Sequence, residues 1–265
     1  MKKILLVLLA LFSLVGLTAC NNVKAKELKI DGSKADEDDL EDFMDELEEY
    51  YEDNEGVELE NQWYSLSYYR NDKIDEIGEK EDYKRTVEAT GSYYFSKFAY
   101  ETKIKITATV SETYLEDDEK VENKIEITYI YKEGKSYCKT VEHKETENGK
   151  GKEVSYTSEA PEEFSKILNL EALMFNVYAE LEDYALEGDF YQNKNGFSGE
   201  LEFDEDDYEG ISQLKYEYDK KTYQLKSYEV YSNLETDESE TVSYTKIDTK
   251  KFGFISAPKN PEKYN

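Results

Sequence analysis

The stretch Phe98-Ala-Tyr-Glu-Thr-Lys-Ile-Lys-Ile-Thr-Ala-Thr-Val110 decides the fold. Its larger apolar side chains recur at every second position, and lysine and threonine occupy most of the positions between them. Successive side chains of a strand point to opposite faces of a sheet, so this stretch has one apolar and one polar face. The pattern predicts a strand of an antiparallel sheet that is buried on one side and hydrated on the other.

The same alternation predicts strands on both sides of this stretch. The turns Glu133-Gly134 and Asn148-Gly149 are typical of hairpins, and they connect the strands that follow into a meander. A polar segment around Ile74 and Ile77, between the first two strands, is compatible with a short helix. The predicted strands are residues 63–69, 84–94, 98–110, 121–131, 136–143, 152–157, 189–192, 197–203, 214–219, 223–232 and 241–247.

Two segments have helical rather than strand periodicity. Between Ser33 and Tyr51, apolar residues are spaced by three and four, which predicts an amphipathic helix capped by Ser33. Ser158-Glu-Ala-Pro161 is a helix-start signal, and the apolar residues after it occupy more than one side, which predicts a buried helix over residues 158–184. The order of elements predicts an α+β fold: a curved antiparallel sheet, a half-barrel-like meander, packed on an N-terminal and a mid-chain helix.

The first twenty residues indicate export. Lys2 and Lys3 precede an apolar run that is too short to span a bilayer, followed by Leu17-Thr18-Ala19-Cys20. This ending resembles the lipobox of bacterial lipoproteins. The resemblance implies that residues 1–19 are a signal peptide and that Cys20 is lipidated, which anchors the protein to the outer face of the cytoplasmic membrane, or to the outer membrane of a cell with two. Residues 20–33 would be a tether and residues 34–265 a single domain. The alternative is a soluble secreted protein.

Composition and motifs exclude several classes of function. The chain has 33 basic and 62 acidic residues, a net charge of −29 that repels nucleic acid phosphates and anionic lipid surfaces. Besides Cys20 there is one cysteine, Cys138, and His143 is on the opposite parity of the same predicted strand, which argues against a catalytic pair. No metal site of His and Cys, cofactor or enzymatic activity is expected. Catalytic carboxylate pairs remain open, since acidic residues occur throughout.

The aromatic content suggests a place for a ligand. The sequence contains 25 tyrosines and 11 phenylalanines, and large rings on one face of a curved sheet can leave gaps between them. The order of elements resembles that of the LolA/LppX-type lipoprotein carriers, which implies an apolar cavity between sheet and helices. A lipid or amphipathic ligand is therefore a possible partner. The candidate ligand-binding residues are Phe98, Tyr100, Ile104, Tyr129, Tyr131 and Met174.

A second reading of the same rings remains open. Tyrosine can replace leucine as core filler, since strands accept it on both faces. The core would then be closed, and the outer surface of the lipoprotein would bind a partner protein or a component of the cell wall.

Overall fold

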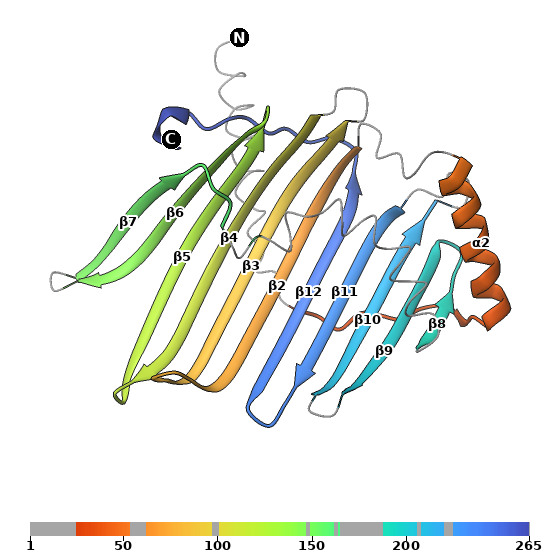
Figure 1. The fold of residues 1–265 in the computed structure, drawn as a ribbon, viewed down its shortest axis with the longest axis horizontal. Helices are drawn as coiled ribbons and strands as arrows, with labels where there is room; N and C mark the ends of the chain where they lie inside the picture. The colour runs from red at the N-terminus through yellow and green to blue at the C-terminus, as the bar shows by residue number, and fades with distance from the viewer. Residues whose placement is uncertain are drawn as a thin grey trace, which may run out of the picture.

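The computed structural model describes residues 25–53, 62–96, 101–146, 149–161, 164, 188–205, 208–219 and 225–264. Twelve strands in these ranges form one antiparallel sheet in the order β1-β8-β9-β10-β11-β12-β2-β3-β4-β5-β6-β7 (Figure 1). The strands are β1 (Ser33–Lys34), β2 (Gln62–Ile77), β3 (Lys80–Ser96), β4 (Glu101–Glu116), β5 (Glu119–Lys132), β6 (Lys135–Thr146), β7 (Gly149–Thr157), β8 (Asp189–Gln192), β9 (Gly196–Glu205), β10 (Tyr208–Tyr218), β11 (Leu225–Glu235) and β12 (Ser239–Lys250).

The sheet consists of two meanders joined side by side. Strands β2 to β7 and strands β8 to β12 each follow one another in sequence, and β12 pairs with β2 from Ser239–Ile74 to Lys250–Trp63. Residues 158–188 therefore connect β7, at one edge of the sheet, to β8, next to the other edge (Figure 1). Two-residue turns close several hairpins, and positive φ at Asp117 and Asp118 (52° and 64°) matches a type I′ turn.

The α+β prediction is wrong, because one antiparallel sheet makes up most of the described chain. Within the described ranges there is one α-helix, α2 (Glu37–Asp53), beside the β8 end of the sheet (Figure 1). The helix predicted over residues 158–184 lies outside the described residues, apart from residues 158–161 and 164. The short helix near Ile74 is also wrong: β2 runs on to Ile77, because its pairing with β3 and β12 satisfies the backbone of this polar segment.

Helix α2 begins later than the sequence suggests. Ser33 is not its cap, since Ser33–Lys34 pairs with β8 as β1. Asp36 takes that role: its Oδ1 accepts a hydrogen bond from the Asp39 backbone N–H at 2.9 Å. Two residues of the apolar stripe pack on the sheet: Leu40 is buried, and the Phe43 ring lies 4.4 Å from that of Phe197.

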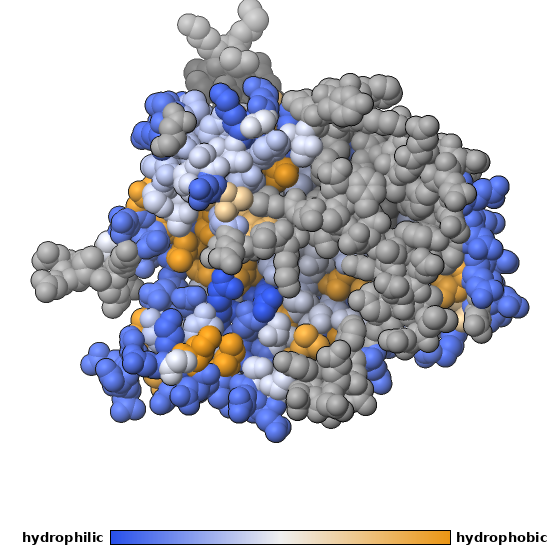
Figure 2. Space-filling view, in the orientation of Figure 1, coloured by the Kyte–Doolittle hydropathy of each residue, from blue (hydrophilic) through white to orange (hydrophobic). Residues whose placement is uncertain are grey.

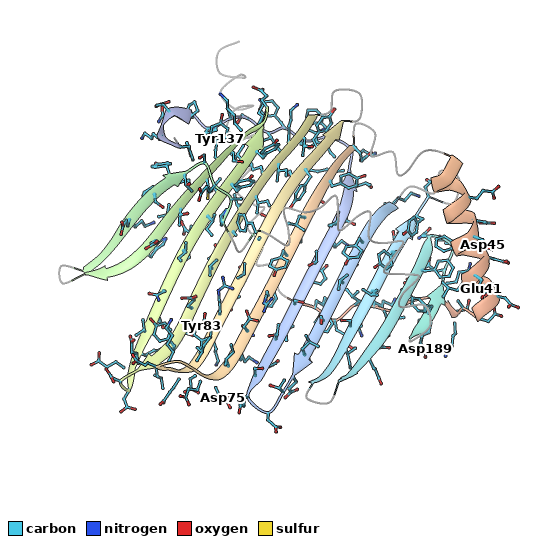
Figure 3. All side chains as sticks on the ribbon, in the orientation of Figure 1. Glu41, Asp45, Asp75, Tyr83, Tyr137 and Asp189 are labelled. Carbon is cyan, nitrogen blue, oxygen red and sulfur yellow. The ribbon has the colours of Figure 1, made fainter. Side chains whose placement is uncertain are left out.

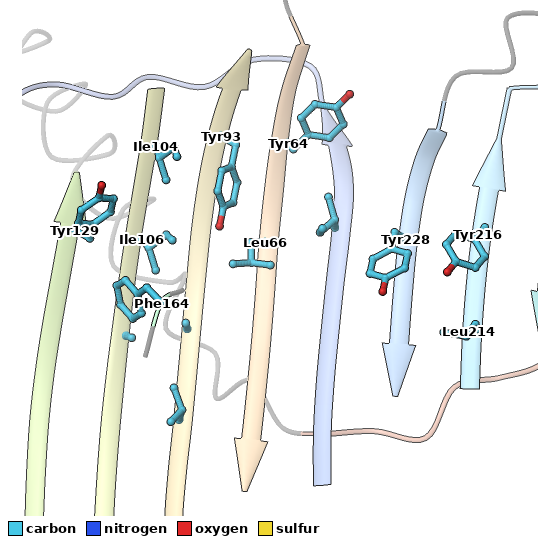
Figure 4. Close-up of a cluster of buried hydrophobic side chains, with 14 of the residues drawn as sticks. Tyr64, Leu66, Tyr93, Ile104, Ile106, Tyr129, Phe164, Leu214, Tyr216 and Tyr228 are labelled. Atoms are coloured by element: carbon cyan, nitrogen blue, oxygen red, sulfur yellow. The ribbon is translucent and has the colours of Figure 1, made fainter. Parts of the chain in front are cut away.

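The core lies on one face of the sheet, which we call the inner face. A transverse row of side chains crosses nine strands on this face, with register pairs running from β9 to β6. The row comprises Phe197, Tyr216, Tyr228, Ile247, Leu66, Gly91, Ile106, Tyr129 and Cys138. Gly91 leaves space for a neighbouring ring, because a Cβ there would lie 3.1 Å from Cε2 of Tyr93. Figure 4 shows several of these side chains on adjacent strands.

Two terminal segments lie on the opposite, outer face. Part of the expected tether packs on β10, where the Leu28 backbone N–H donates to Gln213 Oε1 at 2.7 Å and Leu28 is buried. The C-terminal segment follows β12 and ends in the 3-10 helix η2 (Pro261–Tyr264). Its Tyr264 ring meets those of Tyr137 and Tyr156 edge-on, at 5.5 and 5.0 Å. Both segments therefore cover part of the outer face. The strand pattern alone does not indicate this.

Candidate functional site

Three of the six predicted ligand contacts come together on the inner face. Ile104 and Tyr131 are direct register partners on β4 and β5, and Tyr129 is two positions before Tyr131 on the same face. Ile104 and Tyr129 are buried, with 8% and 5% of their surface exposed. Phe98, Tyr100 and Met174 lie outside the described residues. The shared face is thus established for these three, and their role as ligand contacts stays a prediction.

The surroundings of these residues are apolar. Phe164 meets the Tyr129 ring edge-on, with 6.4 Å between ring centroids, and is fully buried. Tyr93 and Ile106, on β3 and β4, are also fully buried (Figure 4). Burial raises the pKa of the Tyr93 hydroxyl, so this side chain is neutral at physiological pH. This half of the inner face offers contacts of the kind that an alkyl chain or ring system makes.

The inner face becomes charged toward the lower end of the sheet in Figure 1. The chain has only two arginines, Arg70 and Arg85, and both lie there. Arg70 Nε donates to both carboxylate oxygens of Asp72, at 2.8 and 3.0 Å, and the Thr241 hydroxyl donates to Asp72 at 3.0 Å. Asp72 is only 6% exposed, so the pairing compensates its desolvation.

The second arginine forms a neighbouring pair. Arg85 Nε lies 3.6 Å from Glu112 Oε1, and the Tyr83 hydroxyl donates to the same oxygen at 3.0 Å. The register places Arg85 opposite both Asp72 and Glu112, which makes the four charges one contiguous group. We call Arg70, Asp72, Arg85 and Glu112 the arginine cluster. Its guanidinium-bearing side chains keep 35% and 26% of their surface exposed.

The site therefore combines apolar and charged side chains on the same strands. On β2, alternate residues pass from Leu66 through Tyr68 to Arg70, all on the inner face. Burial raises the pKa of Tyr68, and the nearby Arg70 partly offsets this effect. Burial and the adjacent Glu112 carboxylate raise the pKa of Tyr83 to about 12. Both hydroxyls are thus neutral hydrogen-bonding groups beside the charges: Tyr68 lies between Leu66 and Arg70, and Tyr83 lies on the turn side of Arg85.

Sequence reasoning missed the arginine cluster. The predicted strands ended at residue 69 and began again at residue 84, so Arg70 and Asp72 fell outside them. The signal was nevertheless present, because both arginines share the parity of the buried residues: Arg70 that of Leu66, and Arg85 that of Val87. A charged residue that has the same parity as the apolar residues of a strand lies on the buried face of the sheet.

Alkaline pH is expected to destabilise the protein, in part through Tyr83. The folded pKa of Tyr83, about 12, exceeds its ordinary value of 10.0. Its contribution to stability is therefore complete below about pH 10 and is lost as the pH rises toward about 12. Urea unfolding measured at several pH values in this window should show a shallower fall in free energy for Tyr83→Phe than for the parent. Identical slopes for the two proteins would contradict the assignment.

A pocket lies between α2 and the ends of β8, β9 and β10. Its volume is about 240 Å³, below the roughly 300 Å³ at which small-ligand sites usually begin. The lining includes Phe43, Phe197 and Tyr218, with carboxylates of α2 at the rim. In the described ranges no group of three or more His, Cys, Asp or Glu side chains could hold a metal ion. We therefore place the candidate site on the β2–β5 part of the inner face rather than in this pocket near α2.

Comparison with known proteins gives little further information. No protein-family model and no curated protein matches the sequence. Among solved structures, one similar chain is the beta-barrel-like protein of domain of unknown function DUF1849 from Brucella abortus. The two chains are 8% identical over 72% of this chain and 98% of that one, with a TM-score of 0.25. A TM-score this low supports no conclusion about function. No helix in the described part of the chain is long and apolar enough to cross a membrane.

Proposed function

We propose that the protein is a lipid-anchored extracytoplasmic binding protein without catalytic activity. Its ligand is an amphipathic molecule with an anionic headgroup, held on the inner face of the sheet. The observation that carries this proposal is the change along that face from fully buried apolar residues such as Ile106 to the partly exposed Arg70 and Arg85. The Leu17-Thr18-Ala19-Cys20 sequence supports the lipid anchor.

The two halves of the site would act on the two halves of the ligand. Apolar surface removed from water contributes about 25 cal/mol per Å², so an alkyl chain along the β3–β5 rows supplies affinity. A guanidinium has five N–H donors in a planar fork that fits carboxylate and phosphate oxygens. Because Arg70 binds Asp72 through Nε, its position is fixed while further donors remain for an acceptor. Asp72 and Glu112 orient the arginines in the absence of ligand.

The proposal predicts that the two arginines recognise the headgroup of the ligand and not its alkyl chain. The double variant Arg70→Gln/Arg85→Gln should bind a fluorescent fatty acid about tenfold or more weakly, since two charge-assisted hydrogen bonds are lost. Its affinity for the uncharged methyl ester of the same fatty acid should match that of the parent. Titration of the delipidated Cys20→Ser protein measures both affinities.

Lys84→Gln is the matched control for this titration. Lys84 neighbours Arg85 on β3 but is exposed on the outer face, and the substitution removes one positive charge from the same strand. Its affinity for the fatty acid should equal that of the parent. If Lys84→Gln weakens binding as much as the double variant, net charge and not the cluster is responsible. If the parent shows no saturable binding of either ligand, the proposed function is wrong.

The second candidate function is a surface interaction protein with a filled core. The complete burial of Tyr93, Ile106 and Phe164 favours it, because side chains without exposed surface offer nothing to a ligand unless they move. On this reading the arginine cluster is a structural network, and the outer surface meets a partner protein or the cell wall. Native mass spectrometry of the purified protein distinguishes the two, since only the first predicts a bound lipid.

A further inference from the structure

Charge is distributed unevenly along the strands of this acidic protein. Three hairpin turns at the lower end of the sheet are rich in Asp and Glu, namely residues 76–82, 116–119 and 235–240. Figure 3 places Asp75 at this end and Tyr137 at the other, and Figure 2 shows hydrophilic side chains along the lower rim. At the upper end, residues 250–263 contain four lysines and one glutamate. The chain's negative charge is therefore low where the C-terminal segment begins.

The C-terminal segment presents two exposed rings. Phe252 and Phe254 keep 73% and 77% of their surface exposed, the highest fractions among the large apolar side chains of the described ranges. Ile255, between them and the end of the chain, is 3% exposed and fixes the segment on the sheet. Gly253 lies so close to the Trp63 ring that a Cβ could not fit without movement. The two phenylalanines thus project from a segment that is held in place.

Aromatic rings and lysines of the outer face continue this surface. The Trp63 ring lies 6.2 Å from that of Phe252 and 4.9 Å from that of Tyr94. Lys103 Nζ stands over the Tyr94 ring at 5.1 Å, and Lys250 Nζ donates to the Ser92 hydroxyl at 3.3 Å. Lys105, near the start of β4, and Lys251, directly after β12, are exposed. We call Trp63, Tyr94, Lys103, Lys105, Lys250, Lys251, Phe252 and Phe254 the basic aromatic patch.

We propose that the basic aromatic patch docks on the surface of an anionic phospholipid bilayer. Phenylalanine rings enter the boundary between headgroups and acyl chains, Trp and Tyr sit at headgroup level, and lysines contact the lipid phosphates. This combination of residues fits a membrane surface, whose negative charge complements the lysines. Lipidation at Cys20 would keep the patch near a bilayer, but docking does not depend on the ligand site.

The acidic turns at the lower end of the sheet do not prevent this docking. The Debye length is about 8 Å at physiological ionic strength. The sixteen residues of β2 span about 50 Å from the patch to the lower turns, several times this length. The acidic turns are therefore screened from a bilayer that touches the upper end. The sequence-based exclusion of anionic lipid surfaces, drawn from net charge, does not take this separation into account.

Trp63, the only tryptophan of the chain, gives a direct measurement because it belongs to the patch. The full Cys20→Ser protein is titrated with vesicles of phosphatidylcholine alone or with about 30% phosphatidylglycerol, at low and high salt. We expect cosedimentation and a blue shift of Trp63 emission with the anionic vesicles at low salt only. Lys250→Gln/Lys251→Gln should weaken binding about tenfold or more. Phe252→Ser/Phe254→Ser should abolish the blue shift. Both rings are exposed, and equal melting temperatures of this variant and the parent check that it folds.

The matched control is Lys120→Gln/Lys124→Gln, which removes the same charge from exposed lysines near the lower end. It should bind anionic vesicles like the parent. Equal binding to both lipid compositions, or equal losses in the two lysine double variants, overturns the proposal. A second copy of the chain as the occupant would also overturn it, and would appear as dimerisation without vesicles that Phe252→Ser/Phe254→Ser abolishes. The vesicle titration does not depend on whether the protein binds a fatty acid. Membrane docking and ligand binding are therefore tested separately.

Discussion

Replacing Ile106 by alanine is expected to lower the free energy of unfolding by about 2 to 5 kcal/mol, the cost of truncating a buried isoleucine. Ile106 is fully buried in the middle of the transverse row, between Gly91 and Tyr129. The neighbouring strands β3 and β5 fix the side chains around Ile106, so the cavity that alanine leaves cannot readily collapse. Urea unfolding followed by circular dichroism measures the change. The total free energy of unfolding of a native domain is about 5 to 15 kcal/mol. Ile106→Asp should therefore prevent folding, because it would bury an unpaired charge.

Thr107→Ala is the matched control, because Thr107 is the next residue of β4 and is exposed on the outer face. Its hydroxyl lies 3.2 Å from that of Thr90, a solvent-exposed contact. The change should alter the free energy of unfolding by no more than about 0.5 kcal/mol. Comparable losses for Ile106→Ala and Thr107→Ala would contradict the assignment of inner and outer faces.

Cys20→Ser is expected to release the protein from membranes that are washed at high salt. A serine hydroxyl cannot carry the thioether-linked lipid that the lipobox resemblance implies. Cell fractionation and labelling with radioactive palmitate measure the change. The protein should move to the medium, or to the periplasm of a cell with two membranes. Retention of the serine variant in washed membranes together with palmitate label would refute the lipoprotein assignment.

Cys138→Ser provides the control for this experiment. Cys138 is the only other cysteine, and it is 1% exposed on the inner face of β6. This variant should keep both the membrane location and the label. Loss of label from Cys138→Ser alone would show that the wrong cysteine was assigned.

Local features of the sheet could be predicted from the sequence. Strict alternation placed Ile104, Tyr129 and Tyr131 on one face, and their register pairing confirms it. The Glu133–Gly134 turn is also as expected, with φ of 55° and 74° that glycine and its neighbour adopt in a type I′ turn. These features depend on residues within a few positions of each other, and side-chain pattern and turn chemistry determine them directly.

Features that depend on distant partners could not be predicted. The extension of β2 to Ile77 follows from hydrogen bonds to β12 and β3, and the polar residues after Tyr69 give no local sign of them. Ser33 satisfies the rules for a helix cap, but its backbone pairs with β8, so Asp36 begins the helix. The arginine cluster likewise assembles from three adjacent strands, and only correct strand ends reveal that Arg70 faces inward.

The pairing of β12 with β2 has a consequence for the time at which the sheet becomes complete. Synthesis delivers the chain from its N-terminus, so β2 to β7 can form hairpins while β12 has not yet emerged. During that interval the long edge of β2 presents unpaired N–H and C=O groups, a template for strands of other molecules. Contacts between strands so far apart in sequence also form slowly. The newly synthesised chain is therefore expected to be most prone to aggregation just before its last strand is available, and to need a chaperone at that stage.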